Sequence, residues 1–190
     1  MTHPRLREFW RRMVHLATVI IPVAVWTWPE SVWRPLFWAT VIGFLAFDLA
    51  RLRVDAVRRA SRRALAAVLR GYEERRLLGF SWMLLGFAVA VAFYPRPVVL
   101  AVMAYVTVGD AVAGLVGRNW GGAAIPFAKT LGGTLAGLAV NAAAGLLFLP
   151  WPAALAGAVL GSLVEWLPLP PDDNFTVPVI AGGLLWACCA

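Results

Sequence analysis

Charged residues are scarce in this chain of 190 residues. Only 14% of the residues are Asp, Glu, Lys or Arg, whereas 61% are hydrophobic, which argues against a water-soluble globular domain. The chain also has only two cysteines, Cys188 and Cys189. Because they are adjacent, they suit neither a disulfide scaffold nor the spacing of metal ligands, and we interpret them as ordinary apolar side chains. The composition indicates a protein embedded largely in lipid.

Apolar stretches recur along the whole chain, and ten tryptophans suit the interface between a bilayer and water. Because the polar segments between these stretches are too short for a second domain, we expect a single integral-membrane domain over residues 1–190. The predicted fold is an all-α, polytopic helical bundle with about seven transmembrane helices. The expected spans are 13–28, 32–50, 78–94, 97–117, 130–149, 152–166 and 175–190.

The cations are distributed unequally between the two sides of this predicted bundle. Fifteen of the 17 Lys and Arg residues fall on the side of the N-terminus, and only Arg34 and Arg96 fall on the other. The positive-inside rule therefore places the N-terminus in the cytosol and the C-terminus on the opposite side. A net charge of +7 placed in this way favours a membrane surface over nucleic acid. Residues 51–77 are typical of a basic interfacial helix that binds anionic lipid headgroups, although a plain anchoring loop is an equal alternative.

Asp110 is the most informative acid, because it follows about thirteen apolar residues and still lies short of the expected inner boundary. A lone carboxylate at this depth costs roughly 2.5–3.5 kcal/mol, so it needs a cation or a watery cavity. Lys129 is the only lysine among the 17 basic residues. A compact ammonium on a flexible stem suits a moving phosphate. A helix that begins just after Lys129 would add backbone N–H groups for the same anion.

Further polar residues lie near the same face. An acid, two guanidinium groups and an imidazole recur at the spacing i, i+3, i+4 and i+7, so they form one stripe along a helix. Alternatively, the basic residues of this stripe could simply anchor the end of the helix at the membrane surface. Asp48 and Arg51 are spaced for an ion pair within one helix, which leaves structural and functional roles equally open. Asp172, Asp173 and Asn174 offer oxygen ligands to Mg²⁺, but also suit a turn or a helix N-cap. The stripe consists of Glu8, Arg11, Arg12 and His15.

The segment from 109 to 137 is rich in glycine. Such glycines allow close helix packing, and they also allow backbone N–H groups to approach a polyphosphate. The segment is not a P-loop, because Ala123 and Ala128 occupy two required glycine positions. A phosphate cradle on membrane helices remains a hypothesis. Its candidate residues are Gly109, Gly117, Gly121, Gly122, Thr130, Gly133 and Thr134.

The chain resembles the family of CTP-dependent lipid kinases that includes dolichol kinase, phytol kinase and the yeast-type diacylglycerol kinase. Its motifs are Glu8-Phe-Trp-Arg11-Arg12-Met-Val-His15, with Arg for the usual Lys, and Gly109-Asp110-Ala-Val-Ala113-Gly-Leu-Val-Gly117. Glu73 or Glu74 before Gly79-Phe-Ser81 matches a third motif, and Glu165 with Asp172-Asp173-Asn174-Phe-Thr176 matches the acidic end. One departure is Gly132, where the family has Glu.

The resemblance implies an enzyme that transfers the γ-phosphoryl group of CTP to the hydroxyl of a membrane lipid alcohol at the cytosolic face. The acceptor would be a polyprenol, a phytol-like alcohol or diacylglycerol, and Mg²⁺ would assist. Asp110, Asp172 and Asp173 would be metal ligands. The catalytic candidates are Asp48, Asp110, Lys129 and Glu165, and the nucleotide or headgroup would contact the glycine-rich segment, Asn174, Arg51 and the stripe of Glu8, Arg11, Arg12 and His15.

Two other functions compete with this one. A cytidylyltransferase similar to CDP-diacylglycerol synthase shares a loosely similar Gly-Asp organisation, although its Asp-pair signature is not reproduced. A small transporter would use intramembrane Asp110 and Asn141 as a pathway. Such a pathway needs polar groups through the whole bilayer, whereas the polar groups here gather on one side.

Overall fold

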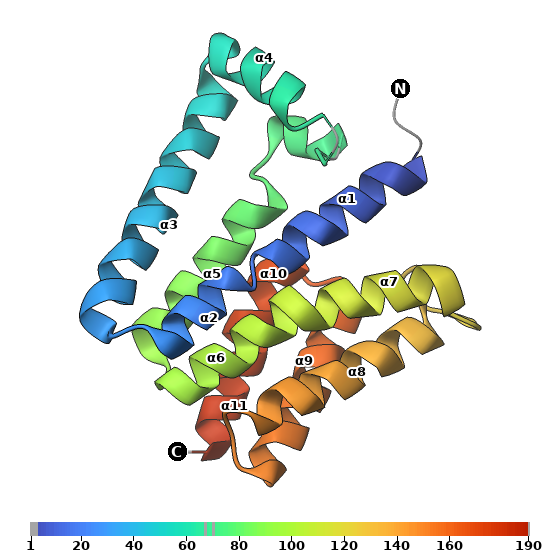
Figure 1. Cartoon of the computed structure of the whole chain (residues 1–190). Coiled ribbons are helices and arrows are strands. Elements are labelled where there is room, and N and C mark those ends of the chain that lie inside the picture. Colours follow the sequence, from blue (N-terminus) through green and yellow to red (C-terminus); the bar gives the residue numbers. More distant parts are fainter. Residues whose placement is uncertain (1–3, 67, 70, 190) are drawn as a thin grey trace.

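The chain folds almost entirely into helices, as the sequence predicts (Figure 1). The computed structural model describes residues 4–66, 68–69 and 71–189. Helices account for 81% of the chain, and the strands in the described residues form one short antiparallel hairpin. The N-terminal elements are α1 (Pro4–Ala17), α2 (Ile20–Thr27), α3 (Glu30–Arg53), α4 (Asp55–Ala64) and the 3₁₀ turn η1 (Gly71–Arg75).

The remaining helices cluster around a shared apolar core (Figure 1). Leu84 and Phe87 of α5 and Met103 of α6 are completely buried in it. The elements are α5 (Gly79–Phe93), α6 (Arg96–Ala104), the π turn η2 (Tyr105–Gly109), α7 (Asp110–Trp120), β1 (Ala124–Ile125), β2 (Lys129–Thr130), α8 (Leu131–Leu146), α9 (Trp151–Trp166), α10 (Asp173–Thr176), the π turn η3 (Val177–Ala181) and α11 (Gly182–Cys189).

Three helical segments are long and apolar enough to cross a membrane. They are Phe9–Thr27, Glu30–Arg53 and Arg96–Trp120. The other predicted spans also correspond to helices, but these are shorter: α8, for example, has 16 residues and rises about 24 Å. Three of the described helices thus have the length and composition of membrane spans, which is consistent with the predicted membrane character, whereas the predicted number of seven spans is not confirmed.

Several helices are directly preceded by a proline at a short connection. Pro29, Pro95 and Pro150 directly precede α3, α6 and α9, and each has an extended ψ angle near 147°. Proline favours such positions because it cannot donate the backbone hydrogen bond that would continue a preceding helix. Arg96 secures the first of these connections: its guanidinium donates to the carbonyls of Val25, Trp26 and Trp28 at the end of α2. These carbonyls would otherwise lack partners.

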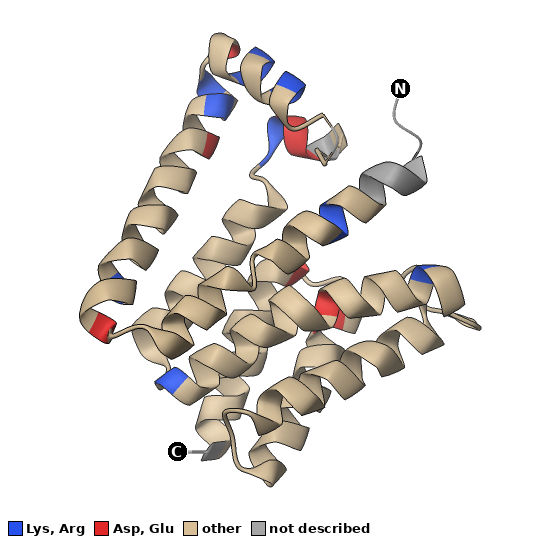
Figure 2. Cartoon of the chain, in the orientation of Figure 1, with Lys and Arg blue, Asp and Glu red and all other residues tan. Residues whose placement is uncertain are grey.

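The predicted basic helix over 51–77 is shorter and broken. Residues 51–53 end α3, Val54 adopts an extended conformation, and α4 turns across the end of the bundle (Figure 1). Figure 2 shows basic residues gathered on α4, with few charges where α3 and α6 begin. The exposed arginines of this region are Arg53, Arg59, Arg62, Arg63, Arg75 and Arg76. They form a basic end to the molecule.

Candidate active site

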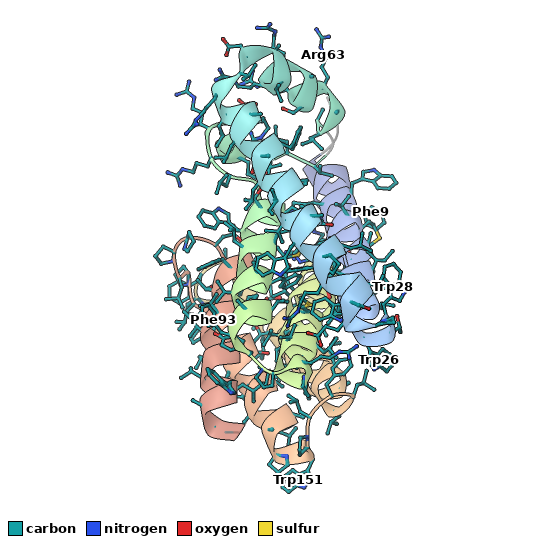
Figure 3. The ribbon with its side chains drawn as sticks, turned by 90° about the vertical axis from the view of Figure 1, so that its left-hand side faces the viewer. Phe9, Trp26, Trp28, Arg63, Phe93 and Trp151 are labelled. Atoms are coloured by element: carbon teal, nitrogen blue, oxygen red, sulfur yellow. The ribbon has the colours of Figure 1, made fainter. Side chains whose placement is uncertain are left out.

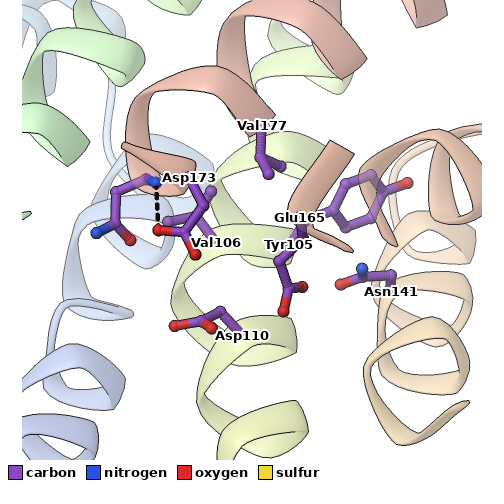
Figure 4. Close-up of a pocket in the computed structure, with 8 residues that line it drawn as sticks. Tyr105, Val106, Asp110, Asn141, Glu165, Asp173 and Val177 are labelled. Atoms are coloured by element: carbon purple, nitrogen blue, oxygen red, sulfur yellow. Dashed lines mark hydrogen bonds between the residues drawn. The ribbon is translucent and has the colours of Figure 1, made fainter. Parts of the chain in front are cut away.

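Three carboxylates from distant parts of the chain line one small cavity (Figure 4). Asp110 begins α7, Glu165 lies at the end of α9 and Asp173 begins α10, and Asn174 lies beside Asp173. The cavity has room for about one water molecule. The sequence analysis expected Asp110, Glu165 and Asp173 on the same face of the bundle, and the fold brings these three acids together.

Arg12 and His15 reach this cavity from α1. The Arg12 guanidinium donates to Asp110 Oδ2 at 2.6 Å and to the Asp110 carbonyl at 3.1 Å. His15 Nε2 lies 2.8 Å from the Val106 carbonyl and 3.9 Å from Asp110 Oδ2. Because a carbonyl oxygen can only accept, Nε2 carries the hydrogen. The cation that Asp110 required is thus Arg12, which lies on the predicted stripe.

The rest of that stripe is only partly described. Arg11 is partly buried and has interactions of its own. Glu8 belongs to α1, but its side chain lies outside the described residues. The stripe therefore contributes two contacts that can be specified, those of Arg12 and His15.

Lys129 approaches from the opposite side, on the β1–β2 hairpin. Its ammonium donates to Glu165 Oε1 at 3.3 Å, and its side chain is 31% exposed. Phe127 and Ala128 in the connecting loop have positive φ angles of 64° and 56°, which are unusual for residues with side chains. The Phe127 ring packs edge-on against Trp166, next to Glu165. The hairpin thereby holds the ammonium at the rim of the cavity.

Both π turns contact the site. Tyr105 and Val106 of η2 and Val177 of η3 line the cavity, and the two turns pack against each other. In η2 the Val106 carbonyl accepts the hydrogen bond from His15. Single π turns within α-helices occur frequently at functional sites. Sequence periodicity gave no signal for either of them.

The acidic end motif divides into two roles. The Asp172 carboxylate accepts from the backbone N–H and side-chain amide of Asn174 at 3.0 and 2.8 Å, so Asp172 is the N-cap of α10. Asp173 lines the cavity. The helix-cap alternative is therefore supported for Asp172, and of the two expected aspartate ligands in this motif Asp173 is the one that lines the cavity.

Most of the candidate glycines have a packing role. A Cβ atom on Gly109 would lie 2.0 Å from Asn141 Oδ1, and one on Gly133 would lie 2.7 Å from the Ala113 carbonyl. Gly117 and Gly121 likewise leave room for Thr130, whose hydroxyl accepts from the Gly133 N–H and caps α8. A helix thus begins just after Lys129, as predicted.

Gly122 differs from these packed glycines. Its φ is +64° and a Cβ atom would meet nothing within 4 Å, so its backbone is open to solvent. Thr134 belongs to the first turns of α8. Among the glycines of the expected phosphate cradle, Gly122 is accessible to a ligand at the hairpin.

Asp48 and Arg51 form a separate buried network and do not line the cavity. Arg51 donates to Asp48 Oδ1 at 2.7 Å and to the carbonyls of Glu73 and Arg76. Asp48 Oδ2 accepts from the Leu78 N–H and the Ser81 hydroxyl. The contacts to Glu73, Arg76 and Leu78 tie α3 to the segment before α5, and the contact to Ser81 ties it to α5 itself, so the geometry supports the structural reading of the pair. It removes Asp48 from the candidate bases and Arg51 from the candidate nucleotide ligands.

Two polar residues that line the cavity, Tyr105 and Asn141, were not assigned to the kinase site from the sequence. Tyr105 and Asn141 are each 1% exposed, and the Tyr105 hydroxyl and Asn141 Oδ1 have no hydrogen-bond partner among the described residues. Unpaired buried polar atoms are uncommon in folded proteins. Asn141 is a polar side chain inside an apolar segment, and this was the signal in the sequence. The sequence analysis interpreted it only as part of a possible transporter pathway.

The oxygen donors suit a divalent cation shared with a ligand. In the part of the chain that the structure describes, no cluster of three His, Cys, Asp or Glu residues could hold a metal ion by itself. Mg²⁺ bound to nucleotides commonly uses one or two carboxylates together with phosphate oxygens and water. Asp110, Glu165 and Asp173 could supply such carboxylates.

The chain was compared with models of protein families, with curated proteins and with solved structures, and none of the three comparisons gives a match.

Proposed function

We propose that the protein is a membrane-embedded kinase that transfers the γ-phosphoryl group of CTP to the hydroxyl of a lipid alcohol. The observation that carries this proposal is the gathering of Asp110, Glu165 and Asp173 around one cavity, with Arg12 and Lys129 at its edges. Phosphoryl transfer depends on positioning and on charge stabilisation more than on covalent chemistry. Acids and cations in one partly buried place provide both.

The charge of the cluster favours a nucleotide that carries a metal ion. Three carboxylates line the cavity, so a bare triphosphate would meet repulsion from these acids. Bound Mg²⁺ would neutralise phosphate charge as it develops during transfer. We assign Asp110 and Asp173 as its candidate protein ligands, in line with the one or two carboxylates that such a site commonly uses, and leave Asp172 as a helix cap.

The chain's own residues have distinct proposed roles. Lys129, at the exposed rim, would bind the phosphates together with the open backbone at Gly122. Arg12 would hold Asp110 in place in the resting site and contact the nucleotide when it binds. Asp110 or Glu165 would accept the proton of the acceptor hydroxyl, because both carboxylates reach the cavity. The cavity is too narrow for a nucleotide, so the elements around it must move apart for CTP to enter.

The proposed orientation follows the positive-inside rule. The N-terminus, α4 and the active site would face the cytosol, and the C-terminus would lie on the opposite side. The other apolar helices would complete a bundle of about seven spans in one domain. The exposed arginines of α4 would bind anionic lipid headgroups, at about 1 kcal/mol for each cation.

A transfer assay tests this function. The purified full-length protein would be incubated in detergent with Mg²⁺, a panel of lipid alcohols, and CTP or ATP labelled at the γ-phosphate. We expect label in the lipid, and more of it from CTP. Cytidine label in the lipid from base-labelled CTP would instead indicate a cytidylyltransferase. Absence of label from every alcohol would contradict the kinase proposal.

A further inference from the structure

Arg12 lies directly against the acidic cluster that lines the cavity. Its Nη1 donates to Asp110 Oδ2 at 2.6 Å and to the Asp110 carbonyl at 3.1 Å. The same guanidinium also attracts the carboxylates of Glu165 and Asp173 electrostatically. Arg12 therefore supplies, from the chain itself, positive charge that Asp110 would otherwise take from a dissolved cation.

The guanidinium fits closely on α7 because residue 114 is a glycine. A Cβ atom at Gly114 would lie 2.2 Å from Arg12 Cζ and 2.6 Å from its Nη2. The atoms that such a Cβ meets belong to the end of a flexible side chain and not to the backbone. Residue 114 thus decides whether the guanidinium can lie beside Asp110 without changing the path of α1 or α7.

Arg12 and a metal ion would compete for the same carboxylate, because Asp110 is also a proposed metal ligand. In the part of the chain that the structure describes, no three His, Cys, Asp or Glu residues could hold a metal by themselves, so the metal also needs phosphate oxygens. The Arg12 side chain is 18% exposed, so a ligand can reach it. A guanidinium binds phosphate as readily as carboxylate. A nucleotide phosphate would therefore draw Arg12 away from Asp110.

We propose that Arg12 is a tethered counter-ion that keeps metal ions off Asp110 until a nucleotide phosphate binds its guanidinium. The phosphate gives Arg12 a new partner, and the released carboxylate becomes available to the metal that the nucleotide carries. Each ligand thereby strengthens the binding of the other, as thermodynamic linkage requires. This inference rests on the proposed function, because it places a metal–nucleotide complex at the cavity.

Binding of Mn²⁺ alone to the full-length protein in detergent tests this proposal, with the free ion followed by electron paramagnetic resonance. Arg12→Gln should bind Mn²⁺ about tenfold more tightly than the unaltered protein, because the competing charged hydrogen bond is lost. The same variant should bind labelled CTP without metal about tenfold more weakly. A purely structural Arg12 would weaken both, and a residue that only binds nucleotide would leave Mn²⁺ binding unchanged.

Gly114→Ala tests the same contact without removing a charge. Its Cβ would displace the guanidinium from α7, so Mn²⁺ should bind about 3- to 10-fold more tightly. This variant decides the test if Arg12→Gln does not fold.

The matched control is Arg34→Gln, which removes an arginine from another pair with an acid. Arg34 lies 3.0 Å from Glu30 at the start of α3. In Figure 3, Trp26 and Trp28 mark the connection that leads into this end of α3, and Phe9 marks α1. Mn²⁺ binding should be unchanged in this variant.

The proposal is overturned if Arg12→Gln or Gly114→Ala folds and fails to tighten Mn²⁺ binding, or if Arg34→Gln tightens it equally. These measurements involve no lipid. A protein that shows the expected binding yet labels no alcohol in the transfer assay would contradict the kinase proposal alone.

Discussion

Asp48 and Asp110 are both acids on helices that are long and apolar enough to cross a membrane, but their surroundings differ. The Asp48 carboxylate is completely buried and receives hydrogen bonds from Arg51, the Leu78 N–H and Ser81. Asp110 is 16% exposed, has Arg12 as its ion-pair partner and faces a cavity. An acid whose oxygens are satisfied by the fold holds helices together, whereas an acid beside a cavity can meet a ligand. The presence of an acid on a long apolar helix does not by itself separate the two roles.

The largest expected effect is on stability. Asp48→Asn would leave the Arg51 guanidinium buried without its counter-charge, and breaking a buried ion pair costs about 3–5 kcal/mol. We expect a large fall in the thermal midpoint in detergent. Matched substitution of Glu30 by Gln, in an exposed pair with Arg34, should change stability by less than about 1 kcal/mol. Equal stability of the two variants would contradict a structural role for Asp48.

The next effect is on catalysis. Asp110→Asn keeps the shape of the side chain but removes its charge, so we expect lipid phosphorylation to fall by roughly 100- to 1000-fold, similar to the loss of one electrostatic contact to a transition state. The protein should still insert and fold, because Arg12 remains near the carboxylates of Asp173 and Glu165. Undiminished turnover with this variant would remove Asp110 from the mechanism.

A smaller effect is expected at the rim of the cavity. Lys129→Ala should raise the KM for the nucleotide by about 10- to 100-fold, the value of a charged hydrogen bond. Lys129→Arg should restore part of the affinity because it retains the charge. Steady-state kinetics over a range of CTP concentrations would measure both variants. If KM is unchanged in Lys129→Ala, the ammonium serves only to pair with Glu165.

The smallest effects separate packing glycines from exposed ones. Gly109→Ala should destabilise the protein by about 1–3 kcal/mol, because its Cβ would overlap Asn141 Oδ1. Gly43→Ala, on α3, meets nothing within 4 Å and should stabilise it by up to about 1 kcal/mol. Thermal melting of the two variants should therefore shift in opposite directions. A destabilised Gly43→Ala would show that this face of α3 is covered.

Hydropathy predicted the helices well, because each long apolar stretch needs internal backbone hydrogen bonds in lipid. It also predicted that Asp110, Lys129 and Glu165 share one end of the bundle. It did not predict that Val54 breaks the basic helix, or that Arg51 reaches the carbonyls of the next segment. These features depend on contacts between residues far apart in sequence.

Within the site, sequence reasoning identified the charged groups better than it identified their roles. The pairing of Arg12 with Asp110 depends on how α1 lies across α7, where a Cβ atom at Gly114 would overlap the Arg12 guanidinium. Tyr105 was missed because a tyrosine in an apolar segment resembles any other core aromatic residue. Tyr105 lines the cavity, but its buried hydroxyl lies close to Gly145 and Gly157 and has no partner among the described residues, which a sequence does not reveal.

The π turn at 105–109 has a consequence for the direction in which Asp110 points. A turn of this kind holds one residue more than a regular α-helical turn, and one residue corresponds to about 100° of rotation around the axis. Shortening the turn by one residue would leave the hydropathy of Arg96–Trp120 almost unchanged, yet it would rotate the carboxylate away from Arg12. The helical phase, set by this one extra residue, therefore decides whether an otherwise ordinary apolar helix places an acid in the cluster.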